Sequence, residues 1–428
     1  MVWQSPIAPG VSWYQESLGE RPEYPPLDGS VSVDVAIIGG GYTGLQAAYN
    51  LVKRGVSVVL IEGARFGDGA SGRNGGQLGT GQRAWPDEME EELGFERAKA
   101  LFDMAENAKR HLLEFAEVHG IDMDYIPGQL NVSHKASYEK AYRRSVEVMT
   151  GRYGYRHLTF MDRAETAERL GSTHYFCGVR DTGTGHIHPL KLLVGLARVA
   201  AEAGARIHEM TPAQAIRQVS GKTLIDTKRG TITAERVLIA TNAYIGNLER
   251  ETAAHVMPIR SFIGATEPLD KFPSILPGKE AVADSRFVVR YFRKSRDNRL
   301  LFGGREAYTA DSPRDISLHI RRQIAELYPS LANINITHGW GGSVGITMPR
   351  KPFAREVMPG VTSIGGYSGH GVMLSNYSGK IYADAIAGNS SELDLFKDLK
   401  VPPFPGGARF RSPLLFLALT WYALRDRF

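Results

Sequence analysis

The sequence predicts an α/β protein, α+β overall, in which a parallel sheet is interleaved with a mainly antiparallel one. Three observations predict it. The apolar, β-branched run 31–38 leads through glycines into a helical segment and a second apolar run, the pattern of a β-α-β unit. Strand and helix signals then alternate as far as Ala243. Between Pro258 and Trp340 strand signals dominate, so we expect the antiparallel part there.

The N-terminal third supplies the first elements in order. Residues 1–30 contain five prolines and are expected to form an irregular arm. The run 31–38 reads as a buried parallel strand because its residues are almost continuously apolar. A helix follows, ends near Gly55, and is succeeded by a second strand at 56–61.

The later elements are predicted from periodicity. Apolar residues recur at helical spacing over 88–119, 190–203, 318–327 and 374–386, and strand patterns cover 205–208, 287–292, 300–302 and 361–364. The cofactor domain is therefore expected to be discontinuous. We expect an arm at 1–30, a Rossmann-like FAD/NAD(P)-binding domain at 31–85, 150–250 and 345–390, a substrate domain at 86–149 and 251–344, and a tail at 391–428.

Composition limits the classes of function. The 428 residues carry a net charge of +5 with both signs scattered, so a nucleic-acid interface is not expected. The single cysteine, Cys177, excludes an internal disulfide and a cysteine-ligated zinc site, and suits a cytoplasmic protein. No secretory signal is recognisable. The apolar run 414–424 is shorter than the about 20 residues of a membrane span. It predicts a packed helix, with Arg425 leaving weak membrane contact open.

A phosphate-binding turn follows the first strand. Residues 39–44 fit the pattern G-x-G-x-x-G and open a helix: Gly39 permits the turn, Gly41 a close approach of pyrophosphate, and Gly44 close helix packing. Tyr42 and Thr43 complete the motif at the start of the helix. Glu62 ends the second strand, where a carboxylate can accept hydrogen bonds from both ribose hydroxyls. This arrangement indicates a dinucleotide without a 2′-phosphate.

Two further glycine-rich loops favour FAD over NAD. The first, 71–77, has small residues that let the backbone pass close to a flat ligand, and Ser71 and Arg73 can meet phosphate oxygens. The second, 365–371, opens a helix whose dipole can stabilise the negative charge of a reduced flavin. The residues expected from these patterns to bind the cofactor are Gly39, Gly41, Tyr42, Thr43, Gly44, Glu62, Ser71 and Arg73.

These segments together resemble the D-amino-acid-oxidase-like FAD superfamily, which includes glycine oxidase and sarcosine oxidase. The resemblance runs in the family's order through 35–44, Glu62, 69–76, 185–189, 237–243 and 366–371. Within the superfamily, 71–77 and the C-terminal segment from Pro402 to Leu424 look most similar to gamma-glutamylputrescine oxidoreductases.

The resemblance implies an oxidation at a C–N bond. A hydride passes from the carbon that bears a neutral amine to flavin N5, and the imine hydrolyses to an aldehyde. It implies a flavin between the Rossmann-like domain and the antiparallel sheet, with O2 as acceptor and H2O2 as product, and a role in polyamine catabolism. The further cofactor-binding residues that it implies are Asn74, Gly75, Gly76, Gln77, Thr241, Gly369, His370 and Gly371. Relatives with covalent flavin use a cysteine near the last glycine loop or a histidine soon after the ribose acid. Neither is present, so we expect non-covalent FAD.

The substrate contacts are predicted less directly. Tyr291 and Arg299, together with Arg290, lie where relatives place oxygen- or carboxylate-handling residues, Trp340 resembles a wall of the active site, and His370 adjoins the last glycine loop. Each also has a structural alternative: solvated strand charges, core packing and helix capping. No metal site is expected, because the histidines of 186–188 have no companion ligands and suit strand or capping roles. Cys177 is expected to be a buried small hydrophobic residue.

Three alternatives stay open at this level. A dehydrogenase would pass electrons to a quinone or carrier protein instead of O2. A flavin-binding protein could lack catalysis altogether. An NAD-only dehydrogenase would be colourless. The residues do not decide between particular amines, including sarcosine, glycine and D-amino acids.

Overall fold

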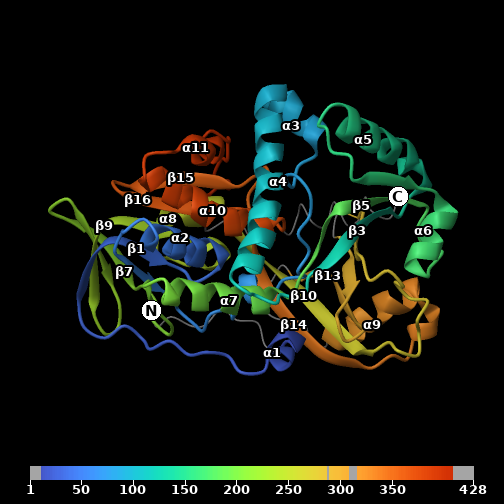
Figure 1. The fold of residues 1–428 in the computed structure, drawn as a ribbon, viewed down its shortest axis with the longest axis horizontal. Helices are drawn as coiled ribbons and strands as arrows, with labels where there is room; N and C mark the ends of the chain where they lie inside the picture. The colour runs from blue at the N-terminus through green and yellow to red at the C-terminus, as the bar shows by residue number, and fades with distance from the viewer. Residues whose placement is uncertain (1–10, 287–288, 308–315, 408–428) are drawn as a thin grey trace.

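The computed structural model describes residues 11–286, 289–307 and 316–407. Two eight-stranded sheets form its framework (Figure 1). Sheet A has the path β15-β16-β9-β1-β2-β6, with β7 and β8 attached beside β9. Sheet B has the order β14-β10-β13-β12-β11-β3-β5-β4. The predicted run 414–424 lies outside the described residues.

Sheet A contains the expected parallel core. Strands β6, β2, β1, β9 and β16 are mutually parallel, whereas β15 and the hairpin β7–β8 are antiparallel additions. Its strands are β1 (Val31–Ile38), β2 (Val58–Ile61), β6 (Arg206–His208), β7 (Ala215–Val219), β8 (Lys222–Asp226), β9 (Thr231–Ile239), β15 (Phe353–Met358) and β16 (Val361–Gly365).

Sheet B is antiparallel except where β11 pairs with β3. Its strands are β3 (Ile126–Ser133), β4 (Leu158–Met161), β5 (Cys177–His186), β10 (Met257–Pro268), β11 (Ala281–Asp284), β12 (Tyr291–Lys294), β13 (Arg299–Ala307) and β14 (Ile336–Ile346). Together, the parallel and antiparallel sheets confirm the predicted fold class.

Helices cover both sheets. They are α1 (Trp13–Leu18), α2 (Tyr42–Val52), α3 (Pro86–Leu93), α4 (Phe95–Val118), α5 (Glu139–Gly151), α6 (Arg163–Leu170), α7 (Pro189–Glu202), α8 (Arg250–His255), α9 (Ile316–Leu327), α10 (Gly371–Ile386) and α11 (Ser391–Lys397). The described residues also form four single-turn 3-10 helices, which are η1 (Ala70–Gly72), η2 (Ala136–Tyr138), η3 (Asn242–Tyr244) and η4 (Pro329–Leu331). Within these ranges no helix combines the length and apolar character needed to cross a membrane.

The sequence division of the chain differs from the sheets at two places. Strands β4 and β5 fall in 150–250, which we assigned to the cofactor domain, yet they extend sheet B beside β3. Helix α4 falls in 86–149, assigned to the substrate domain, yet its apolar face shares one core with α2 and α10. Strand and helix signals show that a segment buries one face, and do not show which partner covers it.

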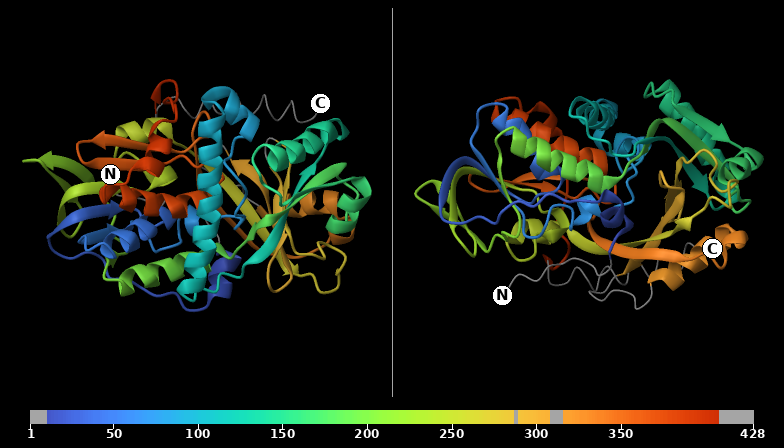
Figure 2. Two further views of the ribbon diagram at one scale, coloured as in Figure 1. Left: turned by 45° about the horizontal axis from the view of Figure 1, so that its top comes forward. Right: turned by 60° about the horizontal axis from the view of Figure 1, so that its bottom comes forward.

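The layers explain where a site can form. Helix α4 runs between the two halves in Figure 1 and in the left view of Figure 2. Helices α2 and α10 pack together and begin after β1 and β16, at the carboxyl end of the parallel strands. In open parallel sheets ligands bind at this end of the strands. Sheet B lies against the same end, so its face closes the space opposite the two helix N-termini.

Candidate active site

A cavity of about 2370 Å³ lies between the two sheets. This exceeds the volume of common small-molecule pockets and leaves room for a large cofactor together with a substrate. Of the residues predicted to bind the cofactor, all except Gly44 line the cavity: Gly39, Gly41, Tyr42, Thr43, Glu62, Ser71, Arg73, Asn74, Gly75, Gly76, Gln77, Thr241, Gly369, His370 and Gly371. The sequence therefore located this cavity.

The first glycine turn is closely packed. Gly39 has φ +110°, and a Cβ there would lie 2.9 Å from the backbone of Ala240. A Cβ on Gly44 would lie 2.0 Å from the Gly39 carbonyl oxygen, so only glycine lets α2 begin this close to β1. Thr43 Oγ1 donates to the Ser375 carbonyl at 2.8 Å and thereby joins the first turns of α2 and α10. The side chains of the motif thus hold the turn, and the helix N-terminus faces the cavity.

Glu62 lies beside this turn at the end of β2. Its Oε2 accepts the Gly40 N–H at 2.7 Å, and its Oε1 accepts the Ala64 N–H at 3.0 Å. Burial raises the pKa of the Glu62 carboxyl, and these backbone donors partly oppose the rise. A carboxylate fixed by two N–H groups at the cavity wall suits the ribose-binding role predicted from its position.

The loop 71–77 is held by its own polar side chains. Asn74 donates to the Ala70 and Ser71 carbonyls at 3.0 and 2.9 Å, and its Oδ1 accepts the Gly76 N–H at 2.8 Å. Gln77 crosses to sheet B and donates to the Val282 carbonyl at 2.9 Å. Arg73 Nε donates to the Gly341 carbonyl at 2.6 Å. The loop is therefore anchored along the cavity to β11 and β14 of sheet B.

Thr241 and Asn242 follow β9 at the same edge. The hydroxyl of Thr241 is shielded from solvent and has no hydrogen-bond partner within the protein. Asn242 has φ +46°, and its Oδ1 accepts the Gly366 N–H at 3.0 Å, which ties η3 to the last glycine loop. A buried hydroxyl without a partner costs free energy unless a ligand supplies one.

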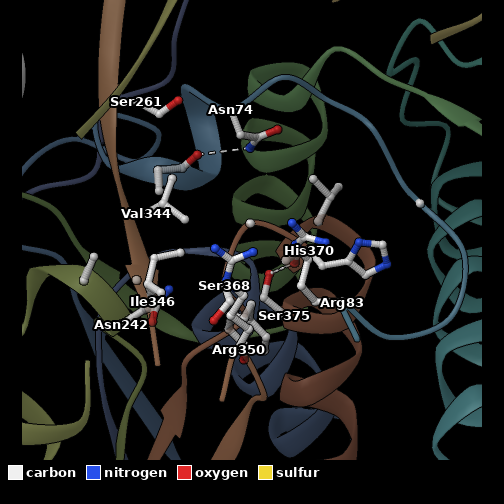
Figure 3. A pocket seen from close by; sticks show the side chains of 18 of the residues that line it. Asn74, Arg83, Asn242, Ser261, Val344, Ile346, Arg350, Ser368, His370 and Ser375 are labelled. Atoms are coloured by element: carbon white, nitrogen blue, oxygen red, sulfur yellow. Dashed lines mark hydrogen bonds between the residues drawn. The ribbon is translucent and has the colours of Figure 1, made fainter. Parts of the chain in front are cut away.

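His370 occupies the N-cap position of α10 without a capping hydrogen bond from its side chain, and it lines the cavity. Its Nε2 lies 3.0 Å from the Gly81 carbonyl oxygen. Burial lowers the pKa of His370 to about 4, and the positive charge of Arg83 adds to the effect. The imidazole is therefore neutral near pH 7. Figure 3 shows Arg83 and Arg350 near His370 and Ser368, on the side of the cavity formed by the last glycine loop.

Sheet B supplies an uncharged face opposite. Ile259 pairs with Val344 and Met257 with Ile346, so these four side chains share one face of the sheet. Residue 261 continues that face, and the Ser261 hydroxyl lies 3.1 Å from the Tyr291 hydroxyl. All six of these residues line the cavity, and Ser261, Val344 and Ile346 are seen together in Figure 3.

Three side chains expected near the substrate do not line the cavity. Trp340 is fully buried in a cluster with Trp13 and Tyr14. Arg299 is held outside by Asp297 and by the Thr266 carbonyl. Arg290 pairs with Glu326 on α9. By register Trp340 shares a face of sheet B with Val344, and Arg299 shares one with Tyr291, which does line the cavity. Trp340 and Arg299 lie further along their strands, where the neighbouring residues cover them.

Sequence reasoning missed Ser261, Val344 and Ile346, together with Arg83 and Arg350. The alternation over 257–263 would have found Ser261, and the alternation over 340–346 would have found Val344 and Ile346, because each pattern marks one face of a strand. Both arginines lie in turns near the cavity, and no local pattern distinguishes them from surface charges.

Other predictions on polar residues are settled by contacts. His188 accepts the Lys191 N–H at 3.1 Å and caps α7, and His186 lies at the end of β5, which confirms strand and capping roles. Cys177 is buried in β5, as expected. In the described part of the chain no group of three or more potential ligand side chains could hold a metal ion.

Comparison with known proteins decides the family. Residues 34–385 match the family described as DAO: FAD dependent oxidoreductase. The chain belongs to this family. The FAD-dependent oxidoreductase assignment confirms the predicted cofactor and enzyme class.

Relatives extend over the whole of this oxidoreductase. A protein of Rhizobium meliloti (strain 1021), named probable oxidoreductase OrdL, is 70% identical over 428 residues, covering 100% of both chains. The gamma-glutamylputrescine oxidoreductase of Escherichia coli (strain K12) is 33% identical, covering 97% of this chain and 98% of that protein. The crystal structure of glycine oxidase from Geobacillus kaustophilus superposes with a TM-score of 0.70 at 23% identity, over 87% of this chain and 96% of that one.

Structural features of the cavity itself fit FAD. The glycine turn leaves no room for side chains, the shielded Thr241 hydroxyl has no protein partner, and two helix N-termini face the same space. Gly39, Gly41 and Glu62 would hold the AMP half of the cofactor. The loop 71–77 would run beside the pyrophosphate and ring, and 369–371 would face the ring's other end.

Proposed function

We propose that this FAD-dependent oxidoreductase oxidises the C–N bond of a small amine, with a gamma-glutamylputrescine-type amine as the preferred substrate. The observation that carries the proposal is the uncharged face of sheet B. A carboxylate next to the reacting carbon, as in an amino acid, would find no cation on this face itself, whereas Arg260 and Arg286 line other parts of the cavity. Burying an unpaired charge is strongly unfavourable. An amine without a neighbouring carboxylate avoids this cost.

Two further observations support the same substrate class. The cavity is large, and Arg83 and Arg350 line it near His370 and Ser368. A substrate that is apolar around its reacting amine and carries a carboxylate at its far end would match both regions. The similarity to the relative named gamma-glutamylputrescine oxidoreductase extends over 98% of that relative's length.

The chain's own residues bind and orient the amine. The hydroxyls of Ser261 and Tyr291 can hold the amine nitrogen, while Val344 and Ile346 exclude water around its carbon. Neutral His370 can accept a hydrogen bond without repelling a cationic group. When bound, FAD supplies the acceptor for the hydride of the carbon next to nitrogen, and the imine then hydrolyses to an aldehyde with release of ammonia or a smaller amine.

The test is anaerobic reduction of the bound flavin by a panel of amines. The panel contains gamma-glutamylputrescine, putrescine, sarcosine, glycine and D-amino acids. We expect the polyamine derivatives to bleach the flavin fastest. Faster bleaching by glycine, sarcosine or D-amino acids would overturn the proposed substrate class.

A second assay addresses the electron acceptor. We propose O2 as the acceptor with H2O2 as product. Peroxide formed in a 1:1 ratio to aldehyde in air supports an oxidase. Aldehyde formed only with an added quinone or carrier protein would show a dehydrogenase instead.

A further inference from the structure

The cavity loop is fixed from behind by three side chains from distant parts of the chain. Trp340 Nε1 donates to the Arg73 carbonyl at 3.1 Å. The Tyr14 hydroxyl donates to the Asn74 carbonyl at 2.8 Å. Arg293 Nε donates to the Gly75 carbonyl at 2.6 Å. Three successive carbonyls of the loop thus each have one side-chain donor, and we call these three donors the clamp.

The clamp is itself rigid and buried. Tyr14 and Trp340 are fully buried and Arg293 is 3% exposed. Arg293 also donates to the Tyr14 hydroxyl at 3.0 Å and to the Ile187 carbonyl at 2.9 Å, so its planar guanidinium serves three acceptors. The Tyr14 and Trp340 rings meet edge to face, with their centroids 5.2 Å apart.

The N-terminal arm supplies one of the three donors. A capping box between Ser12 and Gln15 caps the N-terminus of helix α1 and fixes the turn that carries Tyr14. Ser17 contacts His188 Nε2 at 3.0 Å, and the Tyr14 and His188 ring centroids are 4.8 Å apart. The arm is therefore docked at the back of the loop through several contacts.

The clamp determines which way the loop peptides point. A trans peptide directs its C=O and N–H to opposite sides. Because the Arg73 and Asn74 carbonyls are turned towards the clamp, the N–H groups of Asn74 and Gly75 are directed away from it. Both residues line the cavity on the other side. Backbone N–H groups fixed in this way form a site of positive potential that favours negative charge.

We propose that Tyr14, Arg293 and Trp340 are positioning residues for FAD. They hold the Asn74 and Gly75 peptides in the orientation that binds the cofactor and stabilises its reduced, negatively charged form. The helix α1 of the N-terminal arm is thereby a part of the cofactor site, although it does not line the cavity. This inference depends on the cofactor and is independent of which amine is oxidised.

Tyr14→Phe tests the proposal with minimal disturbance, because only the hydroxyl is removed. Tyr328→Phe is the matched control: Tyr328 is also buried, its hydroxyl donates to the Leu170 carbonyl at 3.0 Å, and it does not line the cavity. Both variants lose one buried hydroxyl-to-carbonyl bond, and Tyr14→Phe also removes an acceptor of Arg293. The thermal midpoint of the apoprotein should therefore fall in both variants, and further in Tyr14→Phe. This comparison separates general stability from cofactor binding.

FAD affinity and the midpoint potential of the bound flavin are then measured for each folded variant. We expect Tyr14→Phe to weaken FAD binding about three- to tenfold, the effect of one hydrogen bond, and to lower the potential. Tyr328→Phe should change neither. Arg293→Lys should weaken binding more, because an ammonium cannot reproduce the planar fork. Wild-type affinity and potential in Tyr14→Phe would overturn the proposal, whether or not the Arg293 variant folds.

Discussion

Removing the shielded hydroxyl of Thr241 should stabilise the apoprotein and weaken its binding of FAD. Thr241 Oγ1 has no partner within the protein and does not cap η3. An unsatisfied buried hydroxyl costs about 1–3 kcal/mol. Thr241→Val should therefore raise the free energy of unfolding of the apoprotein by about 1 kcal/mol. The same change should weaken FAD binding about three- to tenfold, because it removes one hydrogen bond.

The assay combines urea unfolding of the apoprotein with a fluorescence titration of FAD. Thr266→Val is the matched control, since Thr266 is fully buried, donates to the Glu267 carbonyl at 2.7 Å and accepts the Leu300 N–H at 3.0 Å. That variant should lose stability with FAD affinity unchanged. If Thr241→Val destabilises the apoprotein as much as the control does, or binds FAD as tightly as wild type, the reasoning is refuted.

Four further outcomes are expected. Glu62→Gln should weaken FAD binding about tenfold or more, because a hydrogen bond to a charged group contributes about 1.5–3 kcal/mol; titration of the apoprotein checks this, and unchanged affinity would contradict it. Gly44→Ala should lose about 1–3 kcal/mol of stability and its flavin, because the added Cβ would meet a backbone oxygen. Gly151→Ala is the control, since a Cβ added there would have no other atom within 4 Å, and it should fold and bind FAD normally. Thermal unfolding and flavin absorbance measure both variants. Burial lowers the pKa of His188 to about 3, so the unfolded chain binds a proton at a higher pH than the folded chain does. The free energy of unfolding therefore falls as the pH drops below 6.5, by about 1.4 kcal/mol per pH unit. His188→Gln should show a shallower slope of urea midpoint against pH between pH 7 and 5, and a slope equal to that of the wild type would exclude this cause. Acid precipitation should release all flavin into the supernatant, and yellow precipitate would show covalent attachment.

Local sequence signals predicted which residues line one side of the cavity. The motif glycines, Glu62 and the loop 71–77 are close in sequence, and backbone geometry alone requires glycine at Gly39 and Gly44. The cavity lining of these residues follows directly from the order strand, turn and helix.

The substrate side was predicted less well for a physical reason. Arg299 and Tyr291 share one face of sheet B, and only Tyr291 lines the cavity. Which of the two reaches the cavity depends on how far the cavity extends along the strands, and no local sequence pattern shows that extent. The clamp could not be predicted, because its bonds join residues 60, 218 and 267 positions apart. Trp340 was expected at the site on resemblance, and the structure places it behind the loop.

The central claim is that FAD in this cavity takes electrons from the C–N bond of an amine. An anaerobic single turnover with one equivalent of gamma-glutamylputrescine tests it most directly. The account predicts loss of the oxidised flavin absorption and formation of one equivalent of aldehyde per flavin. A bound flavin that stays oxidised with this and every other amine or amino acid of the panel would contradict the claim.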